Sequence, residues 1–112
     1  MYNKKFIKIP ETNENNRSKI LKILIKYNIN FVLPTSNTEL LFWSKNKSFF
    51  KKNSIEIFVA DENSILNCIN KLRFYNKLKD KKIKCVFTTK NADLIKTNFI
   101  VKSNTGSGGN LF

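Results

Sequence analysis

Two stretches of the chain repeat their apolar residues at the spacing of a helix, and four others are rich in β-branched and aromatic residues. The helix-like stretches are residues 16–27 and 61–79. The strand-like stretches lie at residues 6–9, 29–44, 54–60 and 82–89. A chain with helix-like and strand-like stretches in this order is expected to fold as β-α-β-β-α-β.

That order predicts an α+β fold, the ferredoxin-like β-α-β-β-α-β sandwich, in which two helices cover one face of a four-stranded antiparallel sheet. Residues 1–89 would form this domain, with a long basic β-hairpin between its second and third strands. Residues 90–112 would form a C-terminal extension with a short helical turn and a final strand. The residues predicted to build the core by their spacing are Phe6, Ile20, Leu24, Phe31, Ile65, Ile69, Leu72 and Val86.

The charge of the chain is strongly unbalanced. Its 21 lysines and arginines face 8 acidic residues, which gives a formal charge of +13. So much charge on a small protein repels itself, and a polyanionic partner explains it best. A membrane partner is not expected, because the apolar runs are short and no helix combines a basic face with a large apolar one. Arg17 and Arg73 are the only arginines, and the preference for lysine, asparagine and isoleucine indicates an A/T-rich genome.

The sequence offers little material for catalysis. It has no histidine, the usual general base, and its acids do not form the paired carboxylates that hold magnesium. Cys68 and Cys85 match no zinc-binding spacing, and their apolar-patterned positions predict buried free thiols in a reducing compartment. We therefore predict no enzymatic activity, no cofactor, no metal and no small-molecule substrate.

Residues 44–53 read SKNKSFFKKN and combine four lysines with two adjacent aromatic rings. As the tip of a hairpin, this segment would present lysines to phosphates and rings to exposed bases or sugars of RNA. The other interpretation is that the two rings close the local core. The residues predicted to bind RNA are Lys45, Lys47, Phe49, Phe50, Lys51 and Lys52, together with Arg17 and Lys19 on the first helix.

One family fits this arrangement. The segment LPTSNTELLFWSKNKSFFKKNSIEI resembles the hairpin of the ribosomal protein S ten family of the small subunit. Leu33-Pro34-Thr35, Ser44, the lysine pair Lys51-Lys52, and Glu56-Ile57 follow one another in the order of that family. The resemblance departs at Lys45-Asn46, where the family has Pro-His, at the segment after the glutamate strand, and at residues 90–112, which have no counterpart.

The resemblance implies a structural constituent of the small ribosomal subunit, which binds ribosomal RNA in the subunit head through its hairpin. Its partners would be ribosomal RNA and neighbouring head proteins. Its location would be the ribosome of a mitochondrion, where the protein would be organelle-encoded, or of the cytoplasm of an A/T-rich bacterium. Two alternatives stay open: a stand-alone RNA- or DNA-binding regulator encoded by a phage, and a degenerate nucleotidyltransferase-like protein in which Ser54 and Glu56 replace the metal-binding acids.

Overall fold

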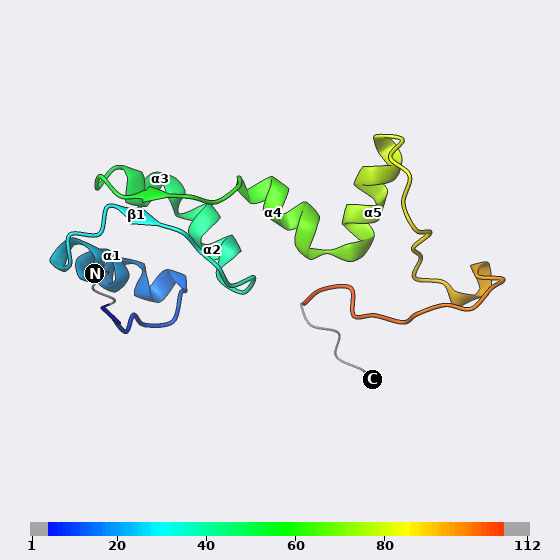
Figure 1. Cartoon of the computed structure of the whole chain (residues 1–112), viewed down its shortest axis with the longest axis horizontal. Helices are drawn as coiled ribbons and strands as arrows, with labels where there is room; N and C mark the ends of the chain where they lie inside the picture. Colours follow the sequence, from blue (N-terminus) through cyan, green and yellow to red (C-terminus); the bar gives the residue numbers. More distant parts are fainter. Residues whose placement is uncertain (1–4, 107–112) are drawn as a thin grey trace. The chain divides into compact units, whose positions relative to one another are not determined.

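The computed structural model describes residues 5–106. The chain divides into two compact units, Met1–Val59 and Ala60–Phe112, which we call the N-terminal unit and the C-terminal unit (Figure 1). Residues 90–106 belong to the same unit as the helices that precede them.

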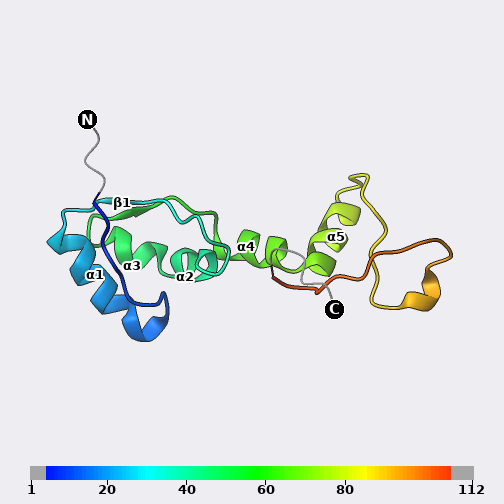
Figure 2. The same ribbon diagram turned by 60° about the horizontal axis from the view of Figure 1, so that its bottom comes forward.

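The N-terminal unit alternates helices and short strands. Its elements are the 3₁₀ turn η1 (Glu14–Asn16), the helix α1 (Arg17–Lys26), the strand β1 (Phe31–Val32), the helices α2 (Leu40–Lys45) and α3 (Lys47–Lys51), and the strand β2 (Glu56–Ile57). The two strands pair in parallel, with Phe31 opposite Glu56 and Val32 opposite Ile57. Parallel strands need a long crossover connection, and residues 33–55, which contain α2 and α3, provide it. The strands run along one side of the unit, with the three helices on the other (Figure 2).

The core of this unit lies between the helices and the strands. Ile20 and Leu24 project from α1 at helical spacing, and Ile55 and Ile57 come from the segment of β2. Between them lies an aromatic cluster of Phe42, Trp43 and Phe50, all buried. The Trp43 ring lies 5.2 Å from Phe50 and 5.1 Å from Phe42, centroid to centroid, as expected for favourable aromatic pairs.

Three helices end in the same motif. The motif contains a position with left-handed backbone that most favours glycine, and here that position holds another residue each time. A residue two or three positions beyond the end of each helix has a positive φ: Asn28 (54°) after α1, Ser54 (60°) after α3 and Lys82 (56°) after α5. The amide of the isoleucine that follows then donates to a carbonyl five residues back, in the bonds Ile29 to Leu24, Ile55 to Phe50 and Ile83 to Leu78. This is the Schellman motif, which also brings an apolar residue after the turn against the end of the helix.

The C-terminal unit contains the helices α4 (Glu62–Ile69) and α5 (Lys71–Asp80) and the 3₁₀ turn η2 (Ala92–Leu94). Asn70 breaks the long helix that periodicity predicts, because its extended backbone ends α4 and its side chain caps the amide of Arg73 in α5. Asp61 caps α4. The hydrogen bond from the Ser64 hydroxyl, and to a smaller extent the one from the Ser64 backbone amide, hold the pKa of the Asp61 carboxyl below its usual value. Between α5 and residue 106 the chain contains η2 as its one regular element and returns to the start of α5, where the amide of Lys71 donates to the carbonyl of Asn104 at 2.8 Å (Figure 1).

The predicted ferredoxin-like β-α-β-β-α-β sandwich is wrong. Residues 5–106 contain only two strands of two residues each, and these are parallel rather than antiparallel. The expected β-hairpin is absent from the described chain, because residues 40–51 form α2 and α3. The stretches at 6–9, 82–89 and 98–103 form no strand. Residues 1–4 and 107–112, at the two ends of the predicted domain and extension, lie outside the described residues.

The predicted core is confirmed at three of its five positions on helices. Ile20, Leu24 and Ile65 are buried, and Ile69 and Leu72 are partly buried. The predictions that depended on strands are wrong: Phe6 is 95% exposed, and Phe31 and Val86 are exposed as well. Of the two thiols predicted to be buried, Cys68 is exposed and Cys85 is half-buried; both are free. In residues 5–106, no helix has the length and apolar character needed to cross a membrane.

The contrast between neighbours on α1 can be tested. Leu24 is 5% exposed and Ile25 is 54% exposed. We expect Leu24→Ala to lower the free energy of unfolding by about 2–5 kcal/mol, because it removes packed methyl groups and leaves a cavity. The matched change Ile25→Ala should cost less than about 1 kcal/mol, because its side chain already meets water. Denaturant unfolding followed by the fluorescence of buried Trp43 measures both, and equal costs would show that the faces of α1 are assigned incorrectly.

The helix ends generate a second prediction. Ser54 has a φ of 60°, which glycine adopts without the steric cost that a side chain brings. We expect Ser54→Gly to raise the free energy of unfolding by about 0.5–1 kcal/mol. Ser48→Gly, at an exposed helical position in α3, should instead lower it by up to about 0.5 kcal/mol. A loss of stability in Ser54→Gly would contradict the assignment of this turn.

Candidate nucleic-acid interface

The segment predicted to be a hairpin tip is helical, and its two rings have different roles. Phe50 is fully buried in the aromatic cluster, so this ring closes the local core, as the second interpretation of the sequence proposed. Phe49 is partly buried and lies edge-to-face against Phe50 at 5.3 Å. The guanidinium of Arg17 lies over the Phe49 ring at 4.3 Å. Both rings therefore belong to the packing of α3, and neither is free at a tip.

A buried asparagine ties this segment to the start of α1. The amide nitrogen of Asn46, which is 3% exposed, donates to the Glu14 carboxylate at 2.7 Å and to the Phe42 carbonyl at 2.9 Å. Its oxygen accepts from Arg17 at 3.1 Å, and Arg17 pairs with Glu14 at 3.5 Å. Arg17 is predicted from the sequence to bind RNA, but in this unit its guanidinium is used to satisfy a buried polar group.

The predicted lysines of the N-terminal unit are not brought to one site. The Lys47 amine donates to the carbonyl of Val59 at 2.9 Å and so fixes the chain after β2. Lys45, Lys51 and Lys52 are exposed at the ends of α2 and α3. Lys19 is exposed on α1, where helical spacing places it on one face with Lys22 and Lys26.

The densest run of basic residues lies in the C-terminal unit. Residues 71–84 hold seven basic residues and one acid, Asp80. Two of the seven contact their own unit: Arg73 donates to Asn63 at 3.2 Å and the Lys71 amine to the Gly106 carbonyl at 3.2 Å. The other five are exposed, and their amines make no hydrogen bond or ion pair with any residue between 5 and 106; these are Lys77, Lys79, Lys81, Lys82 and Lys84.

Part of this positive charge neutralises the partial negative charge at the C-terminal end of α5. The C-terminus of an α-helix carries about half a negative charge, which nearby lysines neutralise. The five lysines and Asp80 together carry far more positive charge than is needed to neutralise the end of the helix. The surplus is therefore available to an anion.

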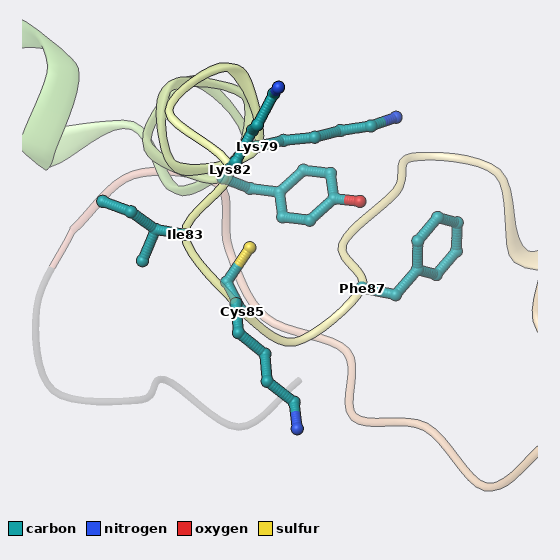
Figure 3. Close-up of a pocket in the computed structure, with 7 residues that line it drawn as sticks. Lys79, Lys82, Ile83, Cys85 and Phe87 are labelled. Carbon is teal, nitrogen blue, oxygen red and sulfur yellow. The ribbon is translucent and has the colours of Figure 1, made fainter.

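These lysines adjoin a shallow hollow that contains aromatic rings. The hollow has a volume of about 340 Å³ and is lined by Tyr75, Lys79, Lys82, Ile83, Lys84, Cys85 and Phe87. Helical spacing places Tyr75 and Lys79 on one face of α5, and Lys82 follows in the turn after the helix. Phe87 faces them from the extended segment, and the sulfur of Cys85 points into the space between (Figure 3). The rings of Tyr75 and Phe87 meet edge-to-face at 6.1 Å.

This site is absent from the residues predicted to bind RNA, although the sequence contains a signal for it. The stretch at 44–53 draws attention with its four lysines, whereas residues 71–79 have the pattern of an ordinary helix. Counting basic residues in windows finds 71–84, where they make up half of the positions. The position of Phe87 is not predictable in this way, because it depends on the chain turning back after Lys82.

Other kinds of site find less support. Among residues 5–106, no group of three or more histidine, cysteine, aspartate or glutamate side chains is placed to hold a metal ion. Ser54 lies in the turn before β2 and Glu56 is exposed on that strand. Comparisons of the chain with protein-family models and with curated proteins give no match.

The Asn46 contacts lead to a prediction about stability. We expect Asn46→Ala to lower the free energy of unfolding by about 1–3 kcal/mol, because Glu14 and Arg17 lose their shared partner and the Phe42 carbonyl keeps only the backbone amide of residue 46 as a donor. Asn53→Ala is the matched control, since its exposed amide makes one hydrogen bond, to the Phe49 carbonyl at 3.0 Å. It should cost less than about 1 kcal/mol. Trp43 fluorescence during unfolding reports both, and equal effects would contradict a special role for the buried amide.

Proposed function

We propose that this protein is a non-catalytic RNA-binding protein that acts as a structural component of a ribonucleoprotein. The observation that carries the proposal is the group of five exposed lysines of α5 and the turn after it, which have no acidic partner among the described residues. Phosphates are the groups that such lysines bind, and each contact releases counterions from the nucleic acid.

Because nearly all its basic residues are lysines, the protein is better suited to contact a phosphate backbone than to recognise a base sequence. Lysine is a point charge without the planar fork that reads guanine in a DNA groove. Of the two arginines, Arg17 is held by Glu14 and Asn46, and Arg73 by Asn63. A surface of free lysines fits contacts to a phosphate backbone, which set register and affinity without specifying bases.

The small ribosomal subunit is the assembly we propose first. The charge of +13 supports it, and so does the order of the short motifs in residues 33–57 that resembles the S ten family, although residues 40–51 form helices and not that family's hairpin. The proposal does not depend on a basic hairpin, because the charge that carries it lies in the C-terminal unit. Sedimentation of an extract of the source organism tests it: the protein should migrate with the small subunit in moderate salt, whereas a stand-alone regulator would stay mostly at the top of the gradient.

The RNA-binding surface can be tested by the salt dependence of binding. We expect the replacement of Lys77, Lys79, Lys81 and Lys82 with glutamine to weaken the binding of the full chain to RNA. For single strands it should reduce the slope of log affinity against log salt by about three, at roughly 0.7 for each phosphate that a lysine no longer neutralises. Folding should be nearly unchanged, because exposed charges contribute little to stability.

A matched variant removes the same charge from the other unit. Replacing Lys19, Lys22, Lys51 and Lys52 with glutamine also removes four exposed lysines, from α1 and the end of α3. It should change the slope by less than the first variant does. The reverse order would place the main RNA contacts in the N-terminal unit and contradict the proposed surface.

A further inference from the structure

The hollow beside α5 brings together positive charge and aromatic rings. Three of its seven lining residues are lysines, and none is acidic. Two more are the aromatic residues Tyr75 and Phe87. Lysines attract the phosphate of a nucleotide, and an aromatic face attracts its base.

Phe87 is the residue that points to a ligand. Its side chain is 56% exposed and lines the hollow together with Lys79, Lys82 and Lys84. The edge-to-face contact with Tyr75 orients the ring. In such a pair, at least one face of each ring stays uncovered by the other, and that face can receive a flat group.

We propose that this hollow binds a single unpaired nucleotide of an RNA strand. The base stacks on Phe87 beside Tyr75, and the phosphates on either side contact Lys79 and Lys82. The inference rests on the proposed function and makes it specific: the RNA is recognised at a single-stranded position rather than along a duplex.

The shape of the hollow supports an unpaired nucleotide over two other ligands. Its volume of about 340 Å³ is at the small end of the ~300–1,000 Å³ of ligand pockets, and it is open to the surface, so the rest of a chain can continue outward. A duplex keeps its bases stacked on one another and offers no base face to Phe87. An acidic peptide would use the lysines and leave the rings unused.

The test compares three RNA probes with the full-length protein. They are an oligouridylate of roughly 8–12 nucleotides, an RNA duplex of the same length, and an oligomer of the same length whose residues lack bases. The variants are Phe87→Ala and, as the matched control, Phe74→Ala, which removes an exposed ring from α5 that does not line the hollow. Circular dichroism confirms that both variants keep their helices.

We expect Phe87→Ala to weaken binding of the oligouridylate by about 5- to 150-fold, the effect of losing one stacked base. It should leave binding of the duplex and of the baseless oligomer, and the salt slope, unchanged. Phe74→Ala should change none of these affinities by more than about twofold. Phe87→Trp should keep or increase affinity for the oligouridylate, and the fluorescence of the new indole should fall when a base stacks on it.

The failures of this inference and of the proposed function are separable. If Phe87→Ala leaves the oligouridylate affinity unchanged, or lowers the affinities for all three probes equally, the nucleotide site is overturned while the protein remains an RNA binder. Competition with polyglutamate is a second check. If polyglutamate displaces the oligouridylate as effectively as RNA does, the nucleotide site is overturned in favour of an acidic protein partner. If the unmodified protein binds none of the RNA probes in a salt-dependent way, the proposed function itself is wrong.

Discussion

The packing of Phe50 against Trp43 and Phe42 is the interaction on which the N-terminal unit depends. The Phe50 ring is fully buried, 5.2 Å from the Trp43 ring and 6.3 Å from the Phe42 ring. Removing one such ring from water contributes on the order of 1.5–3 kcal/mol. The same residue also sets the backbone, because its carbonyl accepts from the amide of Ile55 and directs the chain into β2. Phe50 therefore links α2 and α3 through its ring and the strand that follows them through its backbone carbonyl.

This aromatic cluster also explains the buried polar group beside it. Phe42, Asn46 and Phe50 follow one another at helical spacing, so the side of the helices that buries the rings must also bury Asn46. A buried amide without partners would be costly, and Glu14, Arg17 and the Phe42 carbonyl provide them. The guanidinium of Arg17 is thereby held within the unit, and the start of α1 is joined to the junction of α2 and α3.

The C-terminal unit differs in its physical character. Within residues 60–106, Ile65 is the only buried side chain, while Phe87, Phe99 and Ile100 are exposed. Like the N-terminal unit, the C-terminal unit carries an excess of basic residues, ten against four acidic ones, so its charges repel one another. An RNA partner would act on both features, because phosphates neutralise the lysines and bases cover a ring. Binding to the folded form would then add directly to the stability of this unit.

The residues alone were enough to predict those parts of the structure that depend on local spacing. The helix at 16–27, the helical character of 61–79, the burial of Ile20, Leu24 and Ile65, and the positive charge are all properties of neighbouring residues, which the amino-acid order contains. The role of residues 40–51 could not be predicted in this way. Their helical pattern of Phe42, Trp43 and Phe50 is interrupted by Asn46, which looks like a surface residue until Glu14 and Arg17, about thirty positions earlier, provide its partners. The parallel pairing of β1 with β2 and the meeting of Phe87 with Tyr75 likewise join residues distant in the chain. Only tertiary structure decides such contacts, because their energy depends on which distant groups the folded chain brings together.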